Sequence, residues 1–410
     1  MSDGSSPVDV AVIGGGAAGL MAALFAARRG SRVALLEGSR QCGLKILVSG
    51  GGRCNVLPSE FDHRDFYTSG SRNVLKRLFR TWPLDDVTAF FQNDLGVPLT
   101  IEPETGKVFP RSQKSKEVRD ALVRAVEQAG AEIRCEWRVA GVELDSSGEG
   151  VRIRSEHGAA LRAKRWILAT GGRSLPKTGS DGFGYGLAEQ FGHSCVPTYP
   201  ALVPLATGDE AIRALTGIAI PIRWRAVSGK KTLEDRTREL LFTHRGFSGP
   251  AILDASHWSV RDAVPILIGW GAIEREEWER ALTGNPKRDT RSVVGERLPR
   301  RLAELLCERA KVPDPCTLAH LPKRAKDQLL THLCDYPLPA SGNLGYRVAE
   351  VTGGGVPLGE VNPSTLESRS APSLHLCGEI LDVIGRIGGY NFLWAWVTGR
   401  IAGESAAGTG

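Results

Sequence analysis

An apolar run followed by a cluster of glycines opens the chain. Residues 8–13 are mostly apolar, glycines occupy positions 14–16, and apolar residues then recur at helical spacing as far as Ala27. A second apolar run, residues 32–36, ends at Glu37. The pattern predicts a strand, a tight turn, a helix and a second strand, which together form a β-α-β unit.

The spacing of apolar residues predicts further elements along the chain. Apolar residues three or four positions apart indicate helices, whereas alternation or a short apolar run indicates strands. The predicted helices span residues 74–79, 84–95, 115–129, 274–282, 297–311, 323–334 and 392–402. The predicted strands span residues 132–138, 151–154, 201–205, 218–227, 239–243 and 374–377, with one more inside 166–172 that stops at glycines.

The pattern changes in the middle of the chain. Between residues 196 and 340, prolines separate short strands and helices follow, whereas both flanking parts combine glycine-rich turns with strands and helices. We therefore predict one α/β domain from residues 1–195 and 341–410, interrupted by a β-rich substrate module at 196–272 and a helical module at 273–340. A chain of 410 residues is long enough for two or three domains.

Composition narrows the class of protein. Hydrophobic residues make up 41% and charged residues 24% of the chain, as in globular proteins. The eight cysteines lack C-x-x-C spacing, which favours reduced thiols in the cytoplasm and gives no support to a metal site. The apolar run 10–27 is cut by glycines and has no basic segment before it, so we expect neither a targeting segment nor a membrane partner.

The opening turn has the spacing of a dinucleotide site. Its residues are Gly14, Gly16, Ala17, Ala18 and Gly19. Gly14 permits the tight turn, Gly16 lets the backbone approach a pyrophosphate, and Gly19 lets helix and strand pack closely. The helix that begins at Ala17 would direct its unpaired N–H groups at the phosphates.

Glu37 lies where a carboxylate accepts hydrogen bonds from ribose hydroxyls, and it would repel a 2′-phosphate. The chain holds only one complete fingerprint of this kind. A flavoprotein with its own pyridine-nucleotide domain would show two. The dinucleotide is therefore either a resident FAD served by a transient reductant or NAD alone.

Four ordered motifs carry a family resemblance. They lie at residues 43–55, 242–250, 351–356 and 378–391. Together they resemble the BaiN/YhiN flavoprotein family, which includes aminoacetone oxidase, over nearly the whole chain. The resemblance implies a non-covalently bound FAD and redox chemistry linked to NAD(P)H or oxygen. It also implies a glutathione-reductase-like, Rossmann-like FAD domain interrupted by a small β-barrel and a helical module.

Two positions depart from the family pattern. Leu44 stands where the family usually has a basic residue, and Arg386-Ile387 replaces a turn that is commonly small or Thr-bearing. Both departures bear on the substrate and not on FAD.

Several loops are predicted to contact FAD in addition to the opening turn. The predicted residues are Lys45, Ser49, Gly50, Gly52, Arg53, Cys54, Asn55, Val139, Ala169, Thr170, Gly171, Gly378, Glu379, Asp382, Gly389, Tyr390 and Asn391. Arg53 suits a diphosphate and Asn55 a flavin edge, although both could simply cap their loop. Glu379 or Asp382 would bind ribityl hydroxyls or backbone groups of a neighbouring loop.

A helix that starts near Tyr390 would direct its positive dipole end at the N1 and O2 edge of the flavin. The alternative is a buried C-terminal helix that follows a plain glycine turn. His244, Tyr390 and Asn391 are the candidates for a catalytic role, but a single histidine with no visible carboxylate partner is more often structural.

These residues predict an FAD-dependent oxidoreductase that takes electrons from NAD(P)H or an organic donor and passes them to a small organic acceptor or oxygen. An alternative is a flavin-bearing RNA-binding or RNA-modifying protein, suggested by the net charge of +6 and the basic region 275–335. Acidic residues interleave with that region and aromatic residues do not, so we expect a small-molecule substrate and no nucleic-acid partner. An NAD-only dehydrogenase is the third option.

Overall fold

The computed structural model describes residues 7–145 and 150–408, which form two compact units. Unit 1 combines Met1–Pro200 with Val351–Gly410, and unit 2 is the single stretch Ala201–Glu350. The predicted domain boundaries, after residues 195 and 340, lie five and ten residues before these limits. The further division of the insertion at residue 272 stays a prediction.

The main sheet of unit 1 has the strand order β7-β2-β1-β10-β9-β8, with β20 also paired to β10. Its parallel strands are β1 (Val8–Ile13), β2 (Val33–Leu36), β7 (Glu132–Arg134), the end of β10 (Ala160–Leu168) and β20 (Leu374–Leu376). Antiparallel strands β9 (Val151–Ser155) and β8 (Val139–Leu144) extend it. Because Ile13 pairs with Leu168, the loops after β1 and β10 leave the sheet at the same edge.

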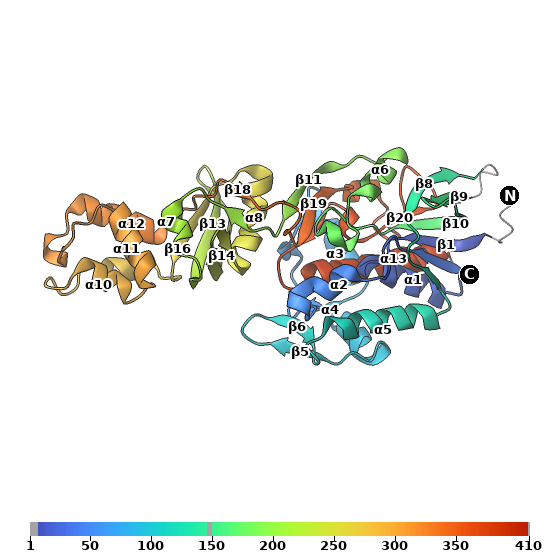
Figure 1. The fold of residues 1–410 in the computed structure, drawn as a ribbon, viewed down its shortest axis with the longest axis horizontal. Coiled ribbons are helices and arrows are strands. Elements are labelled where there is room, and N and C mark those ends of the chain that lie inside the picture. The colour runs from blue at the N-terminus through green and yellow to red at the C-terminus, as the bar shows by residue number, and fades with distance from the viewer. Residues whose placement is uncertain (1–6, 146–149, 409–410) are drawn as a thin grey trace. The chain divides into compact units, whose positions relative to one another are not determined.

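Helices α1 (Ala17–Arg28) and α13 (Tyr390–Ala407) lie side by side in unit 1 (Figure 1). A Cβ on Gly399 would lie 2.4 Å from the Ala18 carbonyl oxygen, and one on Gly403 would lie 2.3 Å from that of Ala22. Glycine at both positions thus lets the two backbones touch. Because Gly399 meets Ala18 and Gly403 meets Ala22, the two helices run in the same direction. Gly399 is the tenth residue of α13 and Ala18 is the second residue of α1, so at 1.5 Å per residue α13 begins about 12 Å before α1 along their shared direction.

Shorter elements complete unit 1. Its other helices are α2 (Leu44–Val48), α3 (Arg72–Arg80), α4 (Leu84–Ala89), α5 (Ser115–Gln128) and α6 (Phe183–Gln190). Its small sheets pair β3 (Leu57–Pro58) and β5 (Leu99–Glu102) with β6 (Lys107–Pro110), β4 (Phe66–Tyr67) with β21 (Ile384–Gly385), and β11 (Val196–Ala201) with β19 (Val351–Gly355).

Unit 2 is built on an antiparallel sheet with the order β17-β16-β13-β14-β15-β12-β18. The strands are β12 (Leu205–Ala206), β13 (Ala219–Ser228), β14 (Lys231–Thr243), β15 (Gly246–Ser248), β16 (Ile266–Trp270), β17 (Tyr336–Pro337) and β18 (Gly342–Asn343). The helices are α7 (Glu210–Arg213), α8 (Pro250–Asp262), α9 (Arg275–Ala281), α10 (Thr290–Gly295), α11 (Arg300–Arg309) and α12 (Lys323–Cys334). Alternate residues of β13, including Ile222 and Trp224, are fully buried in its core.

The α/β fold class is confirmed, and most predicted elements are present. Helix α12 has the predicted bounds, whereas the strand predicted at 201–205 is wrong. Strand β11 ends at Ala201 and β12 begins at Leu205, because Leu202 has a φ of +49° that breaks the extended backbone. Within the described residues, no helix has the length and apolar character needed to cross a membrane.

Candidate cofactor site

The turn after β1 places three glycines in three different surroundings. Gly14 has a φ of +104°, and a Cβ there would lie 2.6 Å from the Ala169 carbonyl oxygen. A Cβ on Gly19 would lie 1.8 Å from the Gly14 carbonyl oxygen, so α1 approaches the end of β1 too closely for any side chain. A Cβ on Gly16 would meet no atom within 4 Å. The backbone at Gly16 therefore borders open space, as the approach of a pyrophosphate requires.

Backbone amides hold the carboxylate of Glu37. The N–H of Gly15 donates to Oε2 at 2.8 Å, and the N–H of Ser39 donates to Oε1 at 2.7 Å. These bonds tie the end of β2 to the glycine turn and fix the direction of the carboxylate. Each oxygen can accept a further hydrogen bond, so the contact with ribose hydroxyls stays a prediction.

The N-terminus of α13 is fixed by predicted site residues. Gly389, its N-cap, has a φ of +92°, and a Cβ there would lie 2.4 Å from the backbone of Leu57. With its amide oriented to satisfy both groups, Asn55 accepts from the Gly389 N–H and donates to the Leu57 carbonyl, each at 3.1 Å. Asn391 accepts from the Gly385 N–H at 2.8 Å and donates to the Gly385 carbonyl at 2.9 Å. Both amides therefore brace backbone around the start of α13.

A polar network joins four segments that are distant in sequence. Lys45 Nζ donates to Glu379 Oε2 and to Ser174 Oγ, each at 2.9 Å. The Ser174 hydroxyl donates to Glu379 Oε1 at 3.0 Å, and that oxygen also accepts from the Thr352 N–H at 2.9 Å. The structure thus pairs the predicted residues Lys45 and Glu379 with each other, and Glu379 binds backbone of a neighbouring loop.

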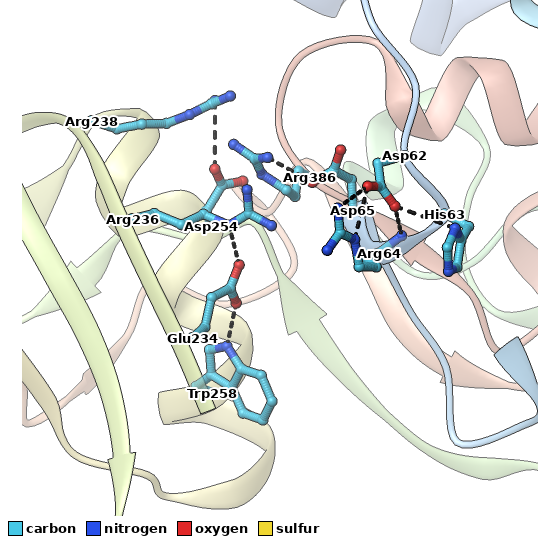
Figure 2. A network of polar contacts seen from close by, with 10 residues as sticks. All are labelled: Asp62, His63, Arg64, Asp65, Glu234, Arg236, Arg238, Asp254, Trp258 and Arg386. Atoms are coloured by element: carbon cyan, nitrogen blue, oxygen red, sulfur yellow. Dashed lines mark hydrogen bonds and ion pairs between the residues drawn. The ribbon is translucent and has the colours of Figure 1, made fainter. Parts of the chain in front are cut away.

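Two carboxylates hold the loop that precedes α13. Asp382 accepts from the N–H of Ser69 at 2.8 Å and from its hydroxyl at 2.5 Å. Arg386 Nη1 donates to Asp65 Oδ1 at 2.7 Å, and both side chains are about one-tenth exposed or less, at 8% and 11%. Figure 2 shows this guanidinium directed at Asp65. Arg386 also lies over the ring of Tyr390, 5.9 Å from its centroid.

Arg53 lies among protein partners. Its Nη1 forms an ion pair with Glu102 at 3.1 Å, and its guanidinium lies 4.2 Å from the centroid of the Phe109 ring. The guanidinium therefore ties the loop to the β5–β6 hairpin. Its role at a diphosphate stays a prediction.

The loop of residues 49–54 is compact. The Ser49 hydroxyl donates to the Ile46 carbonyl at 2.8 Å, and Gly50 and Gly52 have φ values of +56° and +86°. Burial raises the pKa of the Cys54 thiol to about 12. At neutral pH this thiol is protonated and is a poor nucleophile.

The loop after β10 lies beside the glycine turn. The Ala169 N–H donates to the Ile13 carbonyl at 2.9 Å, and Gly171 has a φ of +71°. Thr170 Oγ1 is buried and has no hydrogen-bond partner in the part of the chain that the structure describes.

The segment around Gly378 packs on the first turn of α1. A Cβ on Gly378 would lie 2.7 Å from the Ala18 Cβ.

Val139 follows a segment that binds the end of β2, because the Trp137 N–H donates to the Glu37 carbonyl at 2.9 Å, whereas His244 belongs to unit 2. Val139 is buried at the first position of β8, a strand at the edge of the main sheet. His244 is exposed in the turn between β14 and β15 of unit 2, where its carbonyl accepts from Arg213 Nε at 2.9 Å. Its catalytic role stays a prediction, as does that of Tyr390, whose ring packs edge-on against Phe66 at 5.8 Å.

The residues of unit 1 fit a bound dinucleotide. Glycines cap both α1 and α13, so no N-cap side chain satisfies the first N–H groups of either helix. The two N-termini face the same way with an offset of about 12 Å. Two staggered positive helix ends suit the pyrophosphate and the ring system of one extended FAD, and the Thr170 hydroxyl, which has no partner among the described residues, adds a polar group nearby.

Sequence reasoning missed several residues that hold this site. Ser174, Thr352, Ser69 and Asp65 each bind a predicted site residue or its loop, and of these four Thr352 alone lies in one of the four motifs, at residues 351–356. The sequence did single out Arg386, because this residue departs from the family pattern. Its partner Asp65 lies 321 residues away along the chain.

Comparisons with known proteins agree with this geometry. The chain matches the family described as HI0933-like protein Rossmann domain over residues 8–405. It is 34% identical to a ribosomal RNA dihydrouridine synthase of Escherichia coli (strain K12), over 95% of both chains. It is 32% identical to a 3-dehydro-bile acid delta(4,6)-reductase of Clostridium scindens, over 97% of this chain and 98% of that protein.

A solved structure shares the fold. The 3-ketosteroid-delta4-(5alpha)-dehydrogenase of Rhodococcus jostii RHA1 aligns with 100% of this chain and 98% of its own, with a TM-score of 0.52 and 16% identity. The resemblance to the BaiN/YhiN flavoproteins and the Rossmann-like FAD-binding fold class are thereby confirmed.

Proposed function

Because this chain belongs to the HI0933-like family of Rossmann-domain proteins and is an FAD-dependent oxidoreductase, we propose that it reduces a carbon–carbon double bond conjugated to a carbonyl group, with NAD(P)H as the electron donor and uracil in RNA as the substrate. This substrate departs from the expectation that nucleic acid is absent. The observation that carries the proposal is the full-length similarity to two kinds of reductase.

The names of these relatives point to one type of chemistry. Dihydrouridine differs from uridine by two hydrogens across a double bond next to a carbonyl. A delta(4,6)-reductase of a 3-dehydro bile acid acts on double bonds conjugated to a ketone. In the reaction proposed for this chain, a hydride adds to the alkene carbon farther from the carbonyl and a proton adds to the carbon next to the carbonyl, while NAD(P)H becomes NAD(P)+.

FAD, when bound, supplies the transfer of the electron pair between donor and substrate. The glycine turn and α1 would hold its pyrophosphate, and Glu37 its ribose. The Lys45–Glu379 pair and the bonds of Asn55 and Asn391 keep the surrounding loops in place. Loops that are held rigidly in this way orient the reacting groups and exclude water.

The test is anaerobic incubation of the yellow holoenzyme with NADH or NADPH and ribosomal RNA prepared without dihydrouridine. We expect RNA nucleosides heavier than uridine by two hydrogens, formed only when the nicotinamide nucleotide is present. Oxidation of NAD(P)H that depends on oxygen alone, with no change in the RNA, would contradict the proposal and indicate an oxidase.

A small-molecule enone is the second candidate, because the bile-acid reductase is nearly as similar as the RNA enzymes. The same assay with a 4,6-dien-3-one steroid acid separates the two. Reduction of the steroid without modification of RNA would assign the chain to the small-molecule class.

A further inference from the structure

Helix α3 of unit 1 carries a stripe of cations. The helix contains Arg72, Lys76, Arg77 and Arg80 and no acidic residue, and the stripe consists of Arg72, Lys76 and Arg80. Arg72, Lys76 and Arg80 are four residues apart, so they share one face of the helix with steps of about 6 Å along its axis. Steps of this length are comparable with the distance between successive phosphates of a nucleic-acid strand.

The three cations of this stripe have no protein counter-ion. All are exposed, and in the described chain none forms a hydrogen bond or an ion pair. Two nearby arginines do have partners, since Arg77 donates to the Ser364 hydroxyl at 2.6 Å and Arg64 forms an ion pair with Asp62. Free cations in a row attract an extended anion.

An aromatic cavity of about 330 Å³ opens beside the stripe. Buried Phe79, Trp82 and Leu393 lie in its wall with Phe61, whose ring is 4.6 Å from that of Phe79. Pro83, Leu84, His63 and the basic residues Lys76 and Arg80 of α3 complete the lining, and no acidic residue of the described chain contributes to it. Such a wall suits a flat, apolar ring attached to an anionic chain.

The cavity lies close to the candidate cofactor site. Leu393 is one helical turn after Tyr390 in α13, the helix whose N-terminus would face the flavin. A strand bound along α3 would therefore pass near the site of the proposed reaction.

We infer that the α3 stripe and the aromatic cavity bind a single-stranded segment of the RNA substrate, with phosphates on Arg72, Lys76 and Arg80 and one base against Phe61 and Trp82. The inference rests on the proposed function for the identity of the strand. A steroid carboxylate would fill the cavity but would leave Arg72 without a partner. A lipid surface is disfavoured, since Phe61, 37% exposed, is the one large hydrophobic residue exposed on α3 or the cavity wall within the described residues. Asp85 and Asp86, in the first turn of α4, end the basic surface just beyond the cavity.

The experiment measures binding of a 5′-fluorescein-labelled single-stranded RNA of mixed sequence to the holoenzyme by anisotropy, across a range of KCl concentrations. For the triple variant Arg72→Ala/Lys76→Ala/Arg80→Ala we expect affinity to fall about 100-fold at low salt and the log–log salt slope to become shallower by about 2, at about 0.7 per phosphate. For Phe61→Ala we expect a loss of about 10-fold with an unchanged slope.

A matched control removes two cations elsewhere. Lys323 and Arg324 of α12 are exposed, have no ion-pair partner in the described chain, and lie in the basic region of unit 2. Lys323→Ala/Arg324→Ala should leave RNA affinity unchanged. An equal loss in this control, or full affinity in the α3 triple variant, would overturn the inference. So would saturable binding of cholate, followed by a change in tryptophan fluorescence, in a protein that does not bind RNA.

The two proposals fail separately. NAD(P)H-dependent reduction of a small enone by the α3 triple variant, with RNA modification lost, supports both. RNA binding that depends on α3 without any RNA reduction would refute the proposed reaction and leave the binding surface in place.

Discussion

The two units of this protein are held together in different ways. Unit 1 joins segments from both ends of the chain, and its backbone segments approach one another most closely at glycines such as Gly19 and Gly399. Unit 2 is one continuous stretch with a core of large side chains, among them Trp224, Trp270 and Trp278, which are fully buried.

Their buried polar groups differ as well. In unit 1, Trp394 Nε1 donates to the Gly378 carbonyl and Trp396 Nε1 to the Val56 carbonyl, each at 3.0 Å. In unit 2, the indole N–H groups of the three core tryptophans have no partner among the described residues. Large side chains in unit 1 therefore also position loops, whereas those in unit 2 mainly fill space. Substitutions of the same kind should consequently disturb cofactor binding in unit 1 and only stability in unit 2.

The largest effect is expected at Gly19. A methyl group there would overlap the Gly14 carbonyl, so Gly19→Ala should destabilise unit 1 by on the order of 5 kcal/mol and abolish FAD retention. Gly16→Ala is the matched control, because its Cβ meets no protein atom. It should keep the melting temperature of the apoprotein but lower FAD affinity at least 10-fold. Calorimetry and flavin absorbance measure the two effects, and full FAD occupancy in either variant would contradict the assigned site.

A smaller loss is expected at the buried carboxylates that each unit pairs with arginine (Figure 2). Asp65 faces Arg386 at 2.7 Å in unit 1, and fully buried Asp254 faces Arg238 at 3.5 Å in unit 2. Removing one partner of a buried pair costs about 3–5 kcal/mol, because the remaining charge is left desolvated. Asp65→Ala and Asp254→Ala should both reduce the free energy of unfolding by this amount.

Retention of FAD distinguishes these two variants. Asp65 supports the loop before α13, so Asp65→Ala should also release FAD, whereas Asp254→Ala should retain it. Asp62→Ala serves as a control, since the Asp62–Arg64 pair is more exposed and is screened by solvent, so its loss should lower stability much less. Equal FAD loss from Asp65→Ala and Asp254→Ala would remove the distinction between the units.

The same contrast explains what sequence could predict. Periodic apolar residues identify α12, α5 and the strands β1, β2, β9 and β20 of the main sheet, because burial leaves a repeating pattern, whereas β8 is not predicted. The glycine spacing likewise indicates the opening turn, since its geometry is local. Contacts such as Lys45–Glu379 and Asp65–Arg386 join residues more than 300 positions apart, and no period records them. Leu202 interrupts a predicted strand through a backbone angle that its side chain does not announce.

Acid should weaken both units by a similar, moderate amount. Burial lowers the pKa of His375 in unit 1 to about 4 and that of His257 in unit 2 to about 3. Below the unfolded pKa of about 6.5, the unfolded chain takes up a proton that the folded chain does not accept until pH reaches about 4 or 3. Stability should therefore be full above pH 6.5 and fall by roughly 2 kcal/mol per histidine between pH 7 and pH 5.

Urea unfolding at the two pH values measures this loss, with His375→Gln and His257→Gln as the variants that remove it. If each unit unfolds in its own transition, His375→Gln should flatten the pH dependence of the unit 1 transition and His257→Gln that of unit 2. A pH dependence that survives in both variants would assign the acid sensitivity to other groups.

The smallest effect concerns the tryptophans and tests the comparison most directly. Trp394→Phe removes an indole N–H that donates to the Gly378 carbonyl, so it should cost about 1 kcal/mol beyond the loss of ring volume and should weaken FAD binding. Trp270→Phe removes an N–H that has no partner within the described residues, so it should cost only the volume lost. Because the change in size is the same, the difference between the two variants isolates the hydrogen bond. Equal losses of stability, with FAD retained by both, would show that unit 1 uses its tryptophans in the same way as unit 2.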